Sequence, residues 1–102
     1  MILNQQPDIM QRLRSAAGHL NAVIGMAESG QPCDEVLHQL NAVQSSLRIA
    51  GRKMICCEAE SVREDILNSL SFPQYCTQLH RLQALYTIYI QHFHQPQEDN
   101  YD

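Results

Sequence analysis

The sequence predicts an all-α protein with three helices in each chain. Apolar residues recur in alternating steps of three and four along most of the 102 residues, which is the spacing of one helix face. Two breaks interrupt this pattern, one at Gly30-Gln31-Pro32 and one at Ser69 to Pro73. The chain has no Trp and only four Gly, and no segment shows the strict apolar–polar alternation of a half-buried strand.

The first helix is expected over about residues 8–29. Pro7 suits the first turn of a helix, and Asp8 suits its positive end. Gly30 favours a helix end, and the following Gln31-Pro32 prevents continuation. The residues expected on the inward face are Leu13, Ala16, Leu20, Val23 and Ala27.

The second helix is expected over about residues 33–68, with Asp34 and Glu35 in its first turn. Its apolar stripe comprises Val36, Leu40, Val43, Leu47, Ala50 and Met54. A helix of this length is about 50 Å long, which is too long for one small chain to cover. The sequence therefore predicts a partner chain, with a dimer as the minimum assembly.

The third helix is expected over about residues 73–94, with Ser71 as its cap. Its apolar stripe comprises Tyr75, Leu79, Leu82, Tyr86, Tyr89 and Phe93. Residues 95–102 are polar and acidic, so we expect a disordered tail after a single helical domain at 1–94.

Composition narrows the class of protein. The formal net charge is −4, and hydrophobic residues make up 44% of the chain. No apolar run reaches the length of a membrane span, and the N-terminus lacks the basic and apolar regions of a signal peptide. We therefore expect a cytoplasmic protein without a membrane partner. No phosphate-binding Gly-rich loop or oriented nucleophile is evident, so an enzyme is not expected.

Four cysteines are the candidate reactive groups, and in a reducing compartment they are expected as thiols. Cys33 opens the second helix, where the helix N-terminus favours the thiolate that binds soft metals or attacks electrophiles. Cys57 continues the inward stripe and could equally be a packing residue. Cys56 lies off the stripe, and Cys76 is interpreted as structural or incidental.

Charged and imidazole side chains give the other candidates. Symmetric pairing of chains would multiply a modest basic set, which could then hold phosphates despite the acidic balance. The candidate DNA-binding residues are Arg12, Arg14, Arg48, Arg52 and Lys53. His19, near the first two arginines, could contact phosphate, lend an imidazole to a metal, or be a locally bonded residue.

In the first half of the chain, a set of residues occurs at a particular combination of spacings. It comprises Arg12-Leu13-Arg14, Gly18, Leu20, Ala22-Val23, Met26, Gly30, Cys33, Val36-Leu37, Gln39-Leu40, Ala42-Val43 and Leu47. This spacing resembles the copper-sensitive operon repressor family, which also includes nickel/cobalt and formaldehyde sensors. The resemblance covers about residues 12 to 50.

The resemblance implies a dimer packed as an antiparallel four-helix bundle and a tetramer of two dimers. It also implies a DNA-binding repressor that releases its operator when an inducer reaches the cysteine matching Cys33. In the metal sensors this cysteine meets a His and a second Cys or His from another subunit. The candidate cofactors are therefore Cu(I), Ni, Co and Zn.

The sequence departs from that ligand set. Glu58 stands at the position of the family His, and Val62 stands at the position of the second thiol or imidazole. Cys56 and Cys57 lie just before these positions, so a shifted site is one interpretation, and Glu58 could be a hard-metal ligand. Gln44 replaces an Arg that the family often carries.

Two alternatives stay open at the level of sequence. The chain could keep the fold as a ligand-binding or protein-interaction bundle without binding DNA. It could also be a thiol-redox or persulfide sensor that uses Cys33 with Cys57 across the dimer.

Overall fold

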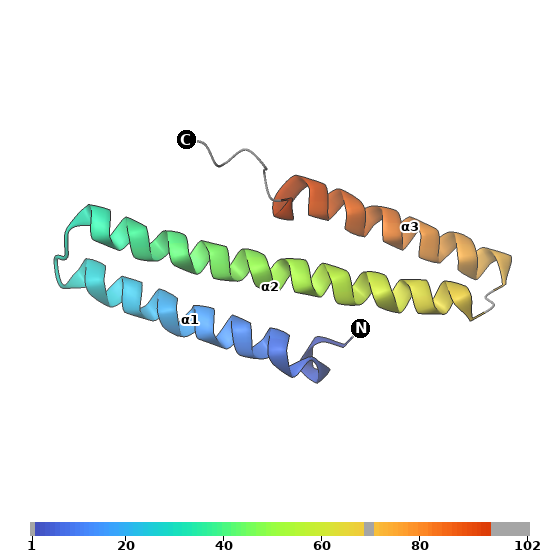
Figure 1. Ribbon diagram of the computed structural model, residues 1–102, viewed down its shortest axis with the longest axis horizontal. Helices are drawn as coiled ribbons and strands as arrows, with labels where there is room; N and C mark the ends of the chain where they lie inside the picture. Colours follow the sequence, from blue (N-terminus) through green and yellow to red (C-terminus); the bar gives the residue numbers. More distant parts are fainter. Residues whose placement is uncertain (1, 69–70, 95–102) are drawn as a thin grey trace. The chain divides into compact units, whose positions relative to one another are not determined.

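The fold is all-α, as the sequence predicts. The computed structural model describes residues 2–68 and 71–94, and none of these residues is in a strand. A short 3₁₀ turn, η1 (Leu3–Gln5), precedes α1 (Pro7–Glu28), and α2 (Cys33–Leu67) and α3 (Phe72–Ile88) follow (Figure 1). The tail expected at 95–102 lies outside the described residues.

The third helix differs from the prediction at its end. The α-helical hydrogen bonding stops at Ile88, and a π-helical turn, η2 (Tyr89–Phe93), completes the segment that was expected to be α-helical to residue 94. At this turn the rings of Tyr89 and His94 meet edge to face, with their centroids 6.1 Å apart.

Local signals account for the helix boundaries. Gly30 adopts the left-handed region with a φ of 79°, and the amides of Gly30 and Gln31 bond the carbonyls of Ala27 and Met26 at 3.2 and 3.1 Å. This pair of bonds is a Schellman motif, which a residue other than glycine would strain. At the start of α3, Ser71 and Gln74 form a reciprocal capping box.

The chain divides into two compact units, an N-terminal unit (Ile2–Met54) and a C-terminal unit (Ile55–Asp102). The N-terminal unit contains α1 beside the first part of α2 (Figure 1). Its buried apolar side chains come from both helices, and they are Ile9, Ala16, Val23, Val43 and Ala50.

The C-terminal unit contains the last part of α2, α3 and η2. Val62 is fully buried there. Polar bonds also join the two helices of this unit, since Gln78 Nε2 donates to Asp65 Oδ2 at 2.8 Å.

The predicted inward stripes are only partly covered. Leu20 and Leu47 remain 40% and 44% exposed, and Tyr75, Leu79 and Tyr86 of α3 are exposed as well. One neighbouring helix covers only part of a stripe of this width. No described helix is long and apolar enough to span a bilayer.

Candidate functional site

The candidate DNA-binding residues all lie in the N-terminal unit. Residues 2–54 contain five basic and four acidic residues, a net charge of +1, whereas residues 55–102 contain two basic and seven acidic residues, a net charge of −5. The acidity of the chain is therefore concentrated in the half that lacks the candidate DNA contacts. Arg14 is exposed, and Arg12, Arg48, Arg52 and Lys53 are half-buried.

Cys33 is the first residue of α2, as expected, and its side chain is exposed. The carbonyl of Pro32 accepts the amides of Glu35 and Val36 at 3.0 and 3.1 Å, which starts the helix immediately before the thiol. Along α2, Cys33 shares one helix face with Leu37 and Leu47, which are 57% and 44% exposed. The thiol therefore lies on a helix face where the apolar side chains of Leu37 and Leu47 remain exposed.

His19 is held by a contact within the N-terminal unit. Its Nε2 lies 2.9 Å from Oε1 of Gln39, so α1 and α2 are joined by this hydrogen bond. An amide oxygen can only accept, so Nε2 is the donor in this hydrogen bond. His19 is thus positioned by Gln39, a residue that the sequence singled out only as part of the spacing shared with the repressor family.

Glu58 is the one buried charged residue in the described part of the chain. Arg81 of α3 donates to its Oε2 from Nε and is ion-paired with the same oxygen through Nη2. Burial by itself raises the pKa of this carboxyl, but hydrogen bonds from positively charged donors, Arg81 among them, and the charges of those donors outweigh that effect and lower the pKa from 4.5. This arrangement holds Glu58 as a carboxylate engaged with Arg81.

The remaining candidates are not gathered into a metal centre. Cys56 is exposed, Cys57 is half-buried, and both are free thiols. Val62, at the position of a family ligand, is 1% exposed and belongs to the core. Within residues 2–68 and 71–94, no group of three or more His, Cys, Asp or Glu residues is arranged to hold a metal ion.

Comparison with known proteins identifies the class to which this fold and site belong. A family model described as metal-sensitive transcriptional repressor matches residues 5–83. The chain therefore belongs to the metal-sensitive transcriptional repressor family.

Among curated proteins, the chain is similar to two copper-sensing transcriptional repressors named CsoR. It is 50% identical over 46 residues to that of Mycobacterium ulcerans (strain Agy99), and this segment covers 45% of the chain and 39% of the relative. It is 44% identical, with the same two coverages, to that of Mycobacterium tuberculosis (strain ATCC 25618 / H37Rv). The matched segment thus spans about two fifths of these relatives, and no solved structure matches the chain.

Proposed function

We propose that the chain is a DNA-binding transcriptional repressor released by an inducer at an inter-subunit site around Cys33. The observation that carries this proposal is that one unit presents both an exposed thiol at the start of α2 and five of the seven basic residues. Family membership and the copper-sensing relatives support the same function.

The basic residues of a single chain are too few for tight binding to DNA. A symmetric dimer or tetramer repeats them, and each neutralised phosphate releases counterions, so affinity falls steeply with salt. Because the acidic residues are concentrated in the C-terminal unit, they oppose this contact less than the net charge of −4 suggests.

The inducer site requires a second chain. Cys33 and Cys57 both belong to α2, and positions so far apart in one α-helix are separated by about 36 Å. A thiol pair at these positions must therefore come from two chains. The exposed apolar face that carries Cys33 is the surface on which the second chain would pack.

We infer that the inducer acts by shifting populations. Binding or modification at Cys33 favours an arrangement of the subunits whose basic surfaces no longer match the DNA. A coupling free energy of about 1–3 kcal/mol corresponds to a 5- to 150-fold loss of affinity.

The donor atoms of this chain suit some of the metals that the family implies better than others. A set of two thiolates and one imidazole in the family register does not fit this chain, because Glu58 is bound by Arg81 and Val62 is buried. The soft donors that remain are the thiols of Cys33, Cys57 and Cys56, which suit Cu(I) better than nickel, cobalt or zinc.

The loss of the family ligands at Glu58 and Val62 also favours a second candidate function, a thiol sensor. Because neither position can serve as a metal ligand, the cysteine thiols are the remaining reactive groups among the candidate residues. Mild oxidation by hydrogen peroxide would remove one electron and one proton from each of two thiols, Cys33 of one chain and Cys57 of a second chain. The two sulfurs would form an intermolecular disulfide, and the peroxide would be reduced to two molecules of water. Non-reducing electrophoresis should show a crosslinked dimer that Cys33→Ser eliminates, and wild-type protein without any crosslink would contradict this candidate.

Fluorescence anisotropy of the reduced, metal-free protein tests DNA binding. The probe is duplex DNA from immediately upstream of its own gene, titrated over a range of salt concentrations. We expect specific binding with a steep salt dependence. Binding no tighter than to random duplex at low salt would instead favour a helical bundle that does not act on DNA.

Arg14→Ala should weaken binding to all DNA sequences by a similar factor. Its guanidinium is exposed on α1, and loss of one phosphate contact lowers the slope of log K against log salt by about one. Arg63→Ala is the matched control, because Arg63 is exposed but lies in the acidic C-terminal unit. Equal losses in the two variants would show that general charge, and not the N-terminal unit, determines the affinity.

A further inference from the structure

An apolar hollow lies between α2 and α3 within the C-terminal unit. Its volume is about 330 Å³, at the small end of the range of roughly 300–1,000 Å³ that is typical of small-molecule sites. The residues that line it are Ala59, Glu60, Arg63, Ile66, Leu67 and Leu82. None of them belongs to the Cys33 face or to the candidate DNA contacts, so DNA binding and induction at Cys33 do not use this hollow.

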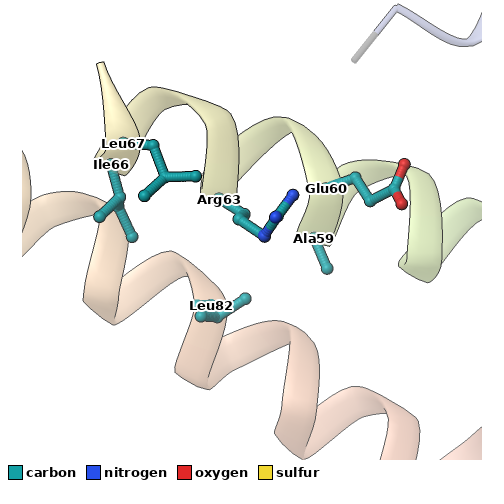
Figure 2. A pocket seen from close by; sticks show the side chains of 6 residues that line it. All are labelled: Ala59, Glu60, Arg63, Ile66, Leu67 and Leu82. Carbon is teal, nitrogen blue, oxygen red and sulfur yellow. The ribbon is translucent and has the colours of Figure 1, made fainter.

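The lining residues of α2 change from charged to apolar along the helix. Glu60 and Arg63 come first, and Ile66 and Leu67 follow about one turn later. Figure 2 shows Leu82 of α3 facing these side chains. Ile66 and Leu82 are half-buried, whereas Leu67 is 66% exposed. The hollow therefore has an apolar end and a charged end, and it is open to a molecule that enters from solvent.

Arg63 is the charged group available at this hollow. Residues 55–102 contain two basic residues, and the other one, Arg81, is ion-paired with Glu58. Arg63 makes no hydrogen bond or ion pair with any residue that the structure describes. Figure 2 shows Arg63 in the middle of the lining residues, whereas the carboxylate of Glu60 points away from Leu82. Because a guanidinium binds a carboxylate through two parallel N–H bonds, this position favours an anionic group.

We propose that the hollow binds a small apolar carboxylate of the medium-chain fatty acid type. The carboxylate contacts Arg63, and the hydrocarbon chain lies against Ile66, Leu67 and Leu82. The chain supplies most of the affinity, because each fully buried CH₂ group strengthens binding about fourfold. The guanidinium determines which end of the molecule lies where. This site goes beyond the proposed function, since it involves neither DNA nor Cys33.

A series of straight-chain carboxylates tests the apolar part of the site. In NMR titrations of the purified, isotope-labelled full chain, affinity should rise by about two- to fourfold for each CH₂ added from hexanoate to octanoate, because the open hollow covers each group only in part. Octylammonium should bind at least several-fold more weakly than octanoate. Absence of octanoate binding, or an affinity that does not increase with chain length, would overturn the proposal.

Arg63→Met tests the charged part of the site, since it keeps an apolar side chain and removes the guanidinium. It should weaken octanoate binding by about five- to tenfold and leave the binding of uncharged n-octanol within about twofold. The matched control is Ala84→Glu, which makes the same change in net charge at an exposed position roughly 160° around the helix from Leu82. Equal losses of octanoate affinity in the two variants would show a general charge effect and would overturn the contact with Arg63.

Glu60→Gln tests the sign of the charge that the site selects. Glu60 is three residues from Arg63 on the same helix, so its carboxylate repels a bound anion at short range. Removal of this charge should raise the affinity for octanoate by about two- to threefold. A lower affinity in Glu60→Gln would mean that the hollow selects a cation, which would overturn the proposal.

Filling the hollow tests its location. Ala59→Phe places a ring among the lining residues and should weaken octanoate and n-octanol alike, by at least about fivefold. Ala84→Phe adds the same ring to the exposed side of α3 and should bind both molecules as the wild type does. Far-ultraviolet circular dichroism would verify the helices of each variant. Unchanged binding in a folded Ala59→Phe would overturn this site, and the comparison at the exposed Arg63 decides the question if Ala59→Phe does not fold.

Discussion

Cys33→Ser should abolish the release of DNA by the inducer while leaving DNA affinity in its absence within about twofold. The substitution removes one exposed thiol and changes the size of the side chain very little, so packing and the basic residues of the N-terminal unit are preserved. Because we propose Cys33 as the group on which the inducer acts, the whole coupling, about 5- to 150-fold in affinity, is expected to disappear.

The measurement is the anisotropy titration with Cu(I), Ni, Zn, formaldehyde or a persulfide donor added to the preformed complex. Cys57→Ser should reduce the response as well, because Cys57 is the proposed second thiol from another chain. The matched control is Cys76→Ser, which removes a half-buried thiol from α3 and should respond as the wild type does. A normal response of Cys33→Ser would exclude this residue as the inducer site.

The helices of this chain were predictable because their boundaries depend on neighbouring residues. Gly30 and Pro32 end one helix and permit the next, and Ser71 with Gln74 caps α3, all within four residues of the boundary. The length of α2 also follows from local sequence, because it contains no proline and its apolar period is uninterrupted. Gly51 does not break it, since the helix runs through that position.

The side-chain pairs were not predictable in the same way. Glu58 and Arg81 are 23 residues apart, and His19 and Gln39 are 20 apart. Each pair depends on how two helices are aligned along each other, which the spacing within either helix does not determine. One signal was present, because a single charged residue in the otherwise uncharged third helix would be expected to have a specific partner.

The exposure of the stripe residues was also not predictable from the sequence. Periodicity identified which residues share a face, but it did not show how much of that face one neighbouring helix covers. Leu47 and Tyr86 both belong to predicted inward stripes, and both are exposed in the structure. Residues of this kind are the ones that a further chain would bury, so their exposure has the same cause as the predicted association.

Arg81→Met should lower the free energy of unfolding by about 2 kcal/mol at neutral pH, which is the range for removing one partner of a partly buried charged hydrogen bond. The Glu58 side chain is only 11% exposed, so its carboxylate would lose a charged donor without gaining much water. Arg81 itself is 57% exposed, which keeps the cost below that of a fully buried pair. Arg63→Met is the matched control, since it removes an exposed cation from the same unit and should change stability by less than about 0.5 kcal/mol.

The difference between wild type and Arg81→Met should depend on pH in a defined direction. The pKa of Glu58 is lowered in the folded chain from 4.5. A lowered pKa contributes stability that is fully present above the unfolded pKa and is lost as pH falls through the folded pKa. Denaturant unfolding at fixed protein concentration should therefore show the full difference at pH 7 and a smaller one on acidification below about 4.5. A difference that stays constant to pH 3 would show that Arg81 stabilises the C-terminal unit by packing alone.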